Sequence, residues 1–155
     1  ALARAVALFK ESVITKLYHA LVVGVPKQRT QHLSSPVDNK KASTDLKVLD
    51  SKKAASHLLL RIDTGRTHQI RAHIAVEGYP IVGESLYGEH KDIYLSQIKP
   101  DYRGKKSGER PLLGRLGLHA QALTIVHPRT GMSIKFEAPL PKDIAAAVRQ
   151  LRKHC

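Results

Sequence analysis

Cysteine is nearly absent from this sequence of 155 residues, since the only one is Cys155 at the last position. The chain therefore has neither an internal disulfide nor a thiolate metal site, which suits a reducing compartment. Long apolar runs are absent too, and none approaches the ~20 residues that a membrane-spanning helix needs. The apolar start, residues 1–9, lacks the order of regions found in a signal peptide. We expect no membrane partner and a cytoplasmic location, or an organelle matrix if a targeting segment lies upstream.

Acidic residues are scarce, because 13 Asp and Glu stand against 26 Lys and Arg and leave a net charge of +13. An excess of this size favours a polyanionic partner, of which nucleic acid is the commonest. An anionic membrane surface is the rival interpretation, and a merely basic protein is the third. The hydrophobic share of 42% is enough for one domain with its own core.

Several catalytic motifs are missing as well. The chain contains no GxSxG elbow, no P-loop and no dinucleotide-binding fingerprint. His68 and His73 are five residues apart, which does not match the helical face of a zinc-binding HExxH motif. His119 and His127 flank a predicted strand and are expected to be hydrogen-bonded structural residues. We therefore predict no metal site.

The pattern of apolar residues predicts an α+β fold, a largely antiparallel mixed sheet flanked by helices. Helices are expected over residues 1–12, 66–77 and 142–154. Strands are expected over 13–24, 43–50 and 56–63, with two more within 116–141 joined by a turn at HPRTG, and a short extended piece is expected near 32–37. Residues 89–111 read as a mobile basic insert.

The stretch RIDTGRTHQIRAH, residues 61–73, concentrates arginine and histidine around one glycine. Asp63 or Thr64 is expected to cap the following helix, and Gly65 to let the backbone bend into it. Arg66 would then lie in the first helical turn, where free N–H groups and the helix dipole favour an anion. Arg71 points well away from Arg66 and is expected to do a different job. The alternative for Arg66 is an ordinary solvated or ion-paired surface residue.

Four blocks of the chain resemble the RluA-type RNA pseudouridine synthases. They are KLYHALVVGVP, ASTDLKVL, LLLRIDTGRTHQIRAHIAVEGYPIVGESLYG and LGLHAQALTIVHPRTGMSIKFEAPLP, and they follow one another in the family's order. The resemblance implies that residues 1–155 form the C-terminal part of the pseudouridine synthase fold, a partial catalytic domain. It also implies an isomerase that acts on structured RNA, ribosomal or transfer, without a cofactor or metal.

The resemblance assigns roles to particular residues. Arg66 matches the basic residue that pairs with the family's catalytic aspartate, and Tyr18 matches the tyrosine that stacks on the target base. Ile81 or Val82 matches the aliphatic wall of the uracil pocket. Tyr18 and Arg66 are therefore expected to meet in one cleft. Candidate contacts to RNA are Arg71, Lys16, His68, Arg103, Lys105 and Lys106.

One departure from the family pattern bears on activity. The upstream motif HRLD, which carries the catalytic aspartate, occurs nowhere in the chain. A fragment that lacks its N-terminal part is one explanation, and a catalytically inactive RNA-binding or ribosome-assembly factor of the same fold is the alternative. A third hypothesis is a basic structural domain that binds other proteins. A smaller departure is Glu84, where the family usually has aspartate.

Overall fold

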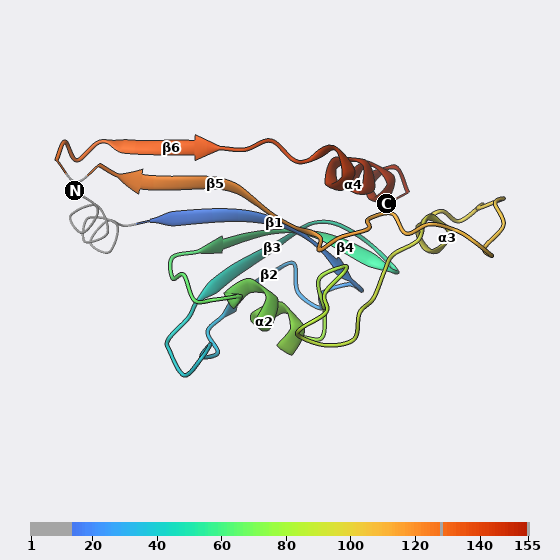
Figure 1. Ribbon diagram of the computed structural model, residues 1–155, viewed down its shortest axis with the longest axis horizontal. Helices are drawn as coiled ribbons and strands as arrows, with labels where there is room; N and C mark the ends of the chain where they lie inside the picture. Colours follow the sequence, from blue (N-terminus) through green and yellow to red (C-terminus); the bar gives the residue numbers. More distant parts are fainter. Residues whose placement is uncertain (1–13, 128, 155) are drawn as a thin grey trace.

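The computed structural model describes residues 14–127 and 129–154, which form one six-stranded sheet with helices on both faces (Figure 1). The sheet order is β2-β3-β4-β1-β5-β6, and every pairing is antiparallel. The strands are β1 Thr15–Val23, β2 Thr30–Leu33, β3 Thr44–Lys52, β4 Ala55–Ile62, β5 Leu118–Val126 and β6 Ser133–Glu137. The helices are α2 Gln69–Val76, α3 Leu95–Ile98 and α4 Lys142–Lys153. The predicted α+β class is confirmed.

Strand β1 is central because both of its faces are covered where it crosses the middle of the sheet. Side chains alternate between the two faces of a strand. Ala20 and Val22 belong to one core cluster, whereas Leu21 between them belongs to another. Burying apolar side chains on both faces explains why this stretch is an almost continuous hydrophobic run.

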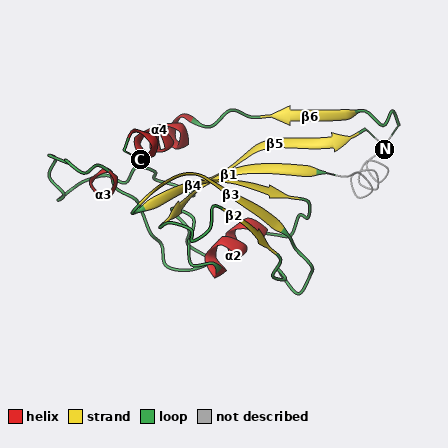
Figure 2. Cartoon of the chain, turned by 180° about the vertical axis from the view of Figure 1, so that it is seen from behind, coloured by secondary structure: helices red, strands yellow, loops and turns green. Residues whose placement is uncertain are grey.

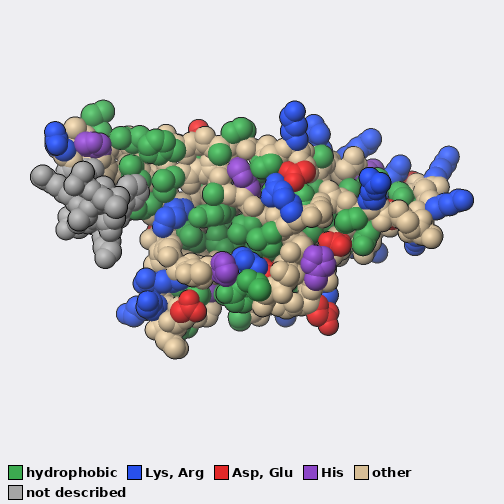
Figure 3. Space-filling view, viewed as in Figure 1, with side chains coloured by type: hydrophobic (Ala, Val, Ile, Leu, Met, Phe, Trp, Pro, Cys, Tyr) green, Lys and Arg blue, Asp and Glu red, His purple; other side chains and the backbone are tan. Residues whose placement is uncertain are grey.

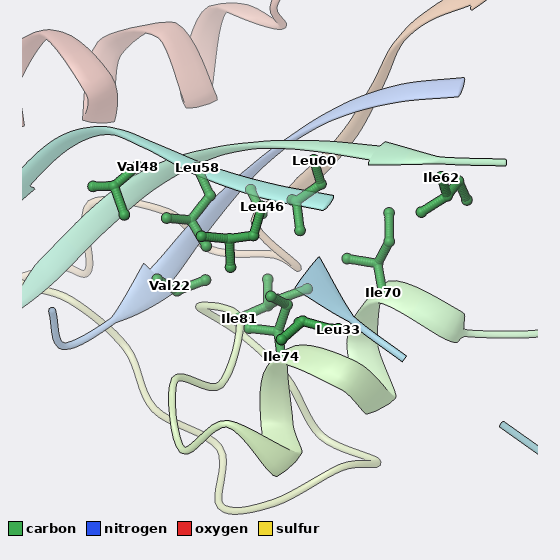
Figure 4. Close-up of a cluster of buried hydrophobic side chains, with 11 residues drawn as sticks. Val22, Leu33, Leu46, Val48, Leu58, Leu60, Ile62, Ile70, Ile74 and Ile81 are labelled. Carbon is green, nitrogen blue, oxygen red and sulfur yellow. The ribbon is translucent and has the colours of Figure 1, made fainter. Parts of the chain in front are cut away.

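The first cluster lies between the sheet and α2 (Figure 4). Ile70 and Ile74, one helical turn apart, are 4% and 0% exposed and point toward the strands. This confirms the spacing that predicted a helix here. Gly78 follows the helix with a φ of +82°, the left-handed conformation that glycine adopts at no steric cost.

The second cluster lies on the opposite face, beneath α4. Ile144, Val148 and Leu151 of α4 pack with Leu21 of β1. Ile93 and Ile98 join them, both 2% exposed, and they anchor the predicted basic insert 89–111 to the domain. The insert is therefore tied to the core at two points and contains a short helix, α3. Its mobility remains a prediction.

Two other details differ from the sequence prediction or lie beyond it. Helix α2 begins at Gln69 rather than near residue 66, and its N-cap is His68 in a left-handed conformation with no side-chain cap. Neither Asp63 nor Thr64 caps the helix, so that prediction is wrong. The predicted helix over residues 1–12 lies outside the described residues. Among the helices of the described part, none is long and apolar enough to cross a membrane.

The β5–β6 hairpin extends away from the rest of the molecule (Figure 2). In Figures 1 and 2, α2 lies under the β2–β3–β4 half of the sheet, and neither α2 nor α4 reaches over the far end of β5 and β6. Three exposed large apolar residues belong to this hairpin: Val126, Met132 and Phe136. The sheet therefore has a wing that no described helix covers.

Candidate active site

A pocket of about 210 Å³ opens where the start of α2 meets β1 and β5. Tyr18 comes from β1 and Arg66 from the turn before α2, so residues distant in the sequence share one pocket, as the sequence predicted. His68, Gln69 and Arg71 line its polar side. None of the lining residues that the structure describes is an aspartate or glutamate.

Tyr18 lies at an irregularity in the sheet. Leu17 pairs with Ala122 but Tyr18 pairs with Ala120, so Gln121 is an extra residue on β5. Such a β-bulge bends the strand and redirects side chains, and bulges are frequent beside active sites. Partial burial raises the pKa of the Tyr18 phenol above its ordinary value, so the group stays protonated at neutral pH.

The turn that carries Arg66 is built around the buried amide of Gln69. Its Oε1 accepts hydrogen bonds from the Arg66 N–H at 3.1 Å and from the Thr64 hydroxyl at 2.8 Å. Its Nε2 donates to the Ser43 carbonyl at 2.8 Å and to the Thr44 hydroxyl at 3.2 Å. The turn is therefore fixed to the start of β3 by a residue whose role the sequence did not reveal.

Arg66 is an exposed residue that lines the pocket. Its Nε donates to the Lys41 carbonyl at 3.1 Å. Within the described part of the chain it has no ion pair with a carboxylate. An arginine held by one main-chain oxygen keeps further donors available for an anion.

The aliphatic wall of the pocket differs from the prediction. Ile81 and Val82 do not line it, because Ile81 packs in the cluster under α2 and Val82 in the cluster under α4. Ile81 is also bridged to Val22 of β1. The apolar lining consists of Ile62, Ile70 and Leu118. The assignment of Ile81 or Val82 to a uracil pocket is therefore wrong for this structure.

Arg71 is also not a free contact for phosphate. Its Nε and Nη2 donate to the two oxygens of Glu84 at 2.8 and 2.6 Å, and the carboxylate is fully buried. The same carboxylate accepts the N–H groups of residues 85, 86 and 87. Arg71 and these N–H groups together lower the pKa of Glu84 to about 2. Arg71 thus secures the 84–87 loop, and we remove it from the candidate RNA contacts.

The remaining candidate contacts fall into two groups. His68 lines the pocket, with a φ of 53° and its Nδ1 3.3 Å from the Tyr87 hydroxyl. Lys16 lies close by, since a Cβ added to Gly65 would lie 2.9 Å from the Lys16 ammonium. The others are exposed on the loop after α3, at an end of the molecule where Figure 3 shows Lys and Arg side chains gathered: Arg103, Lys105 and Lys106.

The predicted structural histidines make the expected kind of contact. His119 Nε2 lies 3.1 Å from the Ala138 carbonyl, and His127 Nδ1 accepts two main-chain N–H groups. His73, whose spacing from His68 does not match a zinc-binding motif, is buried, with its ring nitrogens next to the Thr44 hydroxyl and the Ser35 carbonyl. In the residues that the structure describes, no three His, Cys, Asp or Glu side chains are grouped to hold a metal ion.

Comparison with known proteins gives one consistent result. The family of RNA pseudouridylate synthases matches residues 1–76. An uncharacterized RNA pseudouridine synthase of Chloroflexus aurantiacus is 36% identical over 152 residues, covering 88% of this chain and 42% of that protein. Ribosomal large subunit pseudouridine synthase D of Pseudomonas aeruginosa is 30% identical over 161 residues, covering 96% of this chain and 49% of that protein.

Two solved human structures share the fold. Human RNA pseudouridylate synthase domain containing 1 superimposes with a TM-score of 0.64 at 27% identity, covering 97% of this chain and 70% of that one. Human RNA pseudouridylate synthase domain containing 4 gives a TM-score of 0.67 at 22% identity, covering 97% and 67%, a likeness of fold alone.

The fold and these relatives define the class of protein. The chain belongs to the RNA pseudouridine synthase family, in its RluA-type branch, which confirms the resemblance predicted from the sequence. It spans less than half the length of the two bacterial relatives.

Proposed function

We propose that this chain is the part of an RNA pseudouridine synthase that binds the target uridine, and that a carboxylate from outside residues 1–155 completes its site. The observation that carries the proposal is the shared pocket of Tyr18 and Arg66, which has donors for an anion but no acidic residue among its described lining residues. The target would be a uridine in ribosomal or transfer RNA.

The reaction requires the protein to bind the uridine and to transfer protons. The C1′–N1 bond of uridine breaks, the base turns, and a C1′–C5 bond forms, while one hydrogen leaves C5 and one reaches N1. No atom is gained or lost, so the residues of the pocket need no co-reactant. Its volume of about 210 Å³ suits one flipped pyrimidine base, which an enzyme must take out of the stack to reach.

Most residues that line the pocket have a defined part in this proposal. The Tyr18 ring stacks on the base, and its neutral phenol donates a hydrogen bond to it. Arg66 pairs with the incoming carboxylate and keeps it ionised. Ile62, Ile70 and Leu118 exclude water from the base. Lys16 and His68, together with the exposed cations Arg103, Lys105 and Lys106, contact phosphates.

The test separates binding from catalysis. Residues 1–155 alone should bind structured RNA with an affinity that falls steeply with salt, and should form no pseudouridine, as measured by mass spectrometry of digested transcripts. The natural longer protein, if it carries the carboxylate, should modify the same RNA. Turnover by residues 1–155 alone would contradict the need for an outside carboxylate. An inactive longer protein that still binds RNA would favour the alternative of a ribosome-assembly factor.

A further inference from the structure

A second pocket shares Tyr18 with the first and has no assigned role. It measures about 400 Å³ and lies on the β5–β6 wing of the sheet, which no described helix covers. Lys16 and Tyr18 of β1 line one side, and Phe136 of β6 lines the other. Its apolar floor is formed by side chains and backbone of β5, among them Ala120 and Leu123. Tyr18 therefore stands between two hollows that lie next to each other.

Phe136 is placed unusually for a phenylalanine. It pairs with Leu123 of β5, and 54% of its surface is exposed. The chain has only two phenylalanines, and a side chain this apolar is usually buried. An aromatic ring that stands open on a sheet surface is the kind of platform on which single-stranded nucleic acids stack their bases. The surface of the pocket is mostly apolar, which suits the face of a base rather than its edge. Gln121 and Glu137 also line the pocket, and the Glu137 carboxylate forms an ion pair with Lys135.

Charge favours the same occupant. Lys16 lines this second pocket, and its ammonium lies beside Gly65, the residue before Arg66. A phosphate that joins a base in the first pocket to a base in the second would pass this ammonium. The net charge of +13 attracts a polyanion to the surface as a whole.

We propose that this pocket, defined by Lys16, Tyr18 and Phe136, is a subsite for the nucleotide directly next to the target uridine. The neighbouring base stacks on Phe136, and Lys16 contacts the phosphate between the two nucleotides. The subsite rests on the proposed function, because it is defined relative to a uridine in the Tyr18–Arg66 pocket. Stacking accepts every base, so the subsite would provide affinity and position with little sequence preference.

The test uses residues 1–155 and short single-stranded oligoribonucleotides that contain one uridine. 2-Aminopurine, whose fluorescence falls on stacking, is placed next to the uridine on the 5′ side, next to it on the 3′ side, or four nucleotides away. Binding is followed in parallel by anisotropy of an end label. We expect quenching on binding at one adjacent position and none at the distant position.

Three variants assign the effect to the ring. Phe136→Leu keeps an apolar side chain without a platform, and it should abolish the quenching and weaken binding by roughly 5- to 100-fold, the scale of one lost base stack. Phe136→Tyr should retain both. Met132→Ala removes another exposed apolar side chain from the same hairpin, outside the pocket, and should change neither. Lys16→Gln should lower the salt dependence of binding by about one phosphate contact.

The outcomes separate the subsite from the proposed function. RNA binding with equal fluorescence at adjacent and distant positions overturns the subsite and leaves the proposed function standing. Unchanged quenching in Phe136→Leu overturns the role of the ring. If wild type self-associates in light scattering and Phe136→Leu does not, Phe136 belongs to a protein interface and the subsite is wrong. If no oligonucleotide or structured RNA binds in a salt-dependent way, the proposed function itself fails.

Discussion

The guanidinium of Arg66 is the clearest case in which one side chain decides what the pocket can do. A planar, two-pronged donor fits a carboxylate, whereas an ammonium offers only a point charge. In a protein completed by the carboxylate of the proposed function, we expect Arg66→Ala to lower the rate of a single turnover at saturating RNA by roughly 100-fold, the scale for one lost electrostatic contact in a transition state. Arg66→Lys should fall between this variant and wild type.

A matched control is available at the residue that Arg66 contacts. Lys41→Ala keeps the main-chain carbonyl that Arg66 binds, so it should leave the saturated rate unchanged. If Arg66→Ala weakens RNA binding but leaves that rate intact, Arg66 is a phosphate contact and does not hold the catalytic carboxylate.

Gln69 is the second residue with a large expected effect, in this case on stability. Its side chain is 2% exposed and its amide joins the Arg66 turn to β3. Gln69→Leu preserves the size but leaves the Arg66 N–H and the Ser43 carbonyl without partners, at about 1–3 kcal/mol for each buried group. Denaturant unfolding should show a loss of about 2–4 kcal/mol. The control Gln28→Leu, at an exposed position, should cost less than about 1 kcal/mol.

At the scale of elements, the sequence predicted the strands well because each has a strong local signal. Strands β3 and β4 combine β-branched and leucine residues with a short polar connection, and both formed as expected. The start of α2 was predicted wrongly because the turn before it is held by hydrogen bonds to residues that are distant in the sequence. The Gln69 amide that accepts the Arg66 N–H is itself held by the Ser43 carbonyl and the Thr44 hydroxyl, and the Ser43 N–H donates to the Thr64 hydroxyl. These contacts with residues 43 and 44 require β3 to lie alongside the turn.

The pocket wall shows the same limit. Ile81 and Val82 are as apolar as any pocket residue, and no local pattern distinguishes a core position from a lining position. The long-range contacts assign both to the core, because Ile81 is bridged to Val22 and the Val82 N–H donates to the Leu21 carbonyl. The prediction that Tyr18 and Arg66 share one pocket was correct, because both residues were identified from motifs of the family. The β-bulge at Gln121, next to Tyr18, has no recognisable signal in the sequence.

The loop after α2 depends on one buried ion pair, and this pair has a defined pH dependence. Glu84 has a folded pKa of about 2, against 4.5 for the free group. Because the folded value is the lower one, the stabilisation is complete above pH 4.5 and is lost as the pH falls from there through 2. The shift corresponds to a contribution on the order of 3 kcal/mol.

Acid titration of stability tests this assignment. Glu84→Gln should lose about 2–4 kcal/mol of unfolding free energy at pH 7, and it should flatten the decline of stability between pH 4.5 and 2. The control Glu89→Gln alters a side chain that is 85% exposed and should leave both quantities nearly unchanged. A variant at Glu84 with wild-type acid sensitivity would contradict the role given to the pair.

At the scale of the whole molecule, a chain of polar groups leads from the exposed Arg152 of the C-terminal helix to two buried histidines at the centre of the sheet. Arg152 of α4 donates to Asp50 at 2.9 Å, and His57 lies 3.1 Å from the same oxygen. His57 Nε2 is 2.8 Å from His19 Nδ1, and both rings are buried. Because the carboxylate only accepts, His57 carries its hydrogen on Nδ1 and accepts from His19 through Nε2.

Protonation of His57 would reverse this hydrogen bond. With a proton on Nε2 of His57, the His19 ring would have to carry its hydrogen on Nε2 and accept through Nδ1 at 2.8 Å. Burial is the main cause that lowers the pKa of His57 below its ordinary value, and the nearby Arg152 adds to it although Asp50 opposes it. Burial likewise lowers the pKa of His19, with His57, His119 and Arg152 acting in the same direction and Gln121 against it.

The last prediction follows from the sign of these shifts. Since the folded pKa of His57 lies below the unfolded value of about 6.5, the unfolded chain binds more protons between the two values. Stability is therefore complete above pH 6.5 and declines as the pH falls toward 5. His57→Gln keeps a donor and an acceptor but cannot titrate, so its unfolding free energy, measured in urea at pH 8, 6.5 and 5, should vary less than that of wild type. His90→Gln, which alters an exposed histidine beside Asp92, should retain the wild-type decline. If the His57 variant declines as steeply as wild type, the histidine pair does not set the pH sensitivity of the contact between α4 and the sheet.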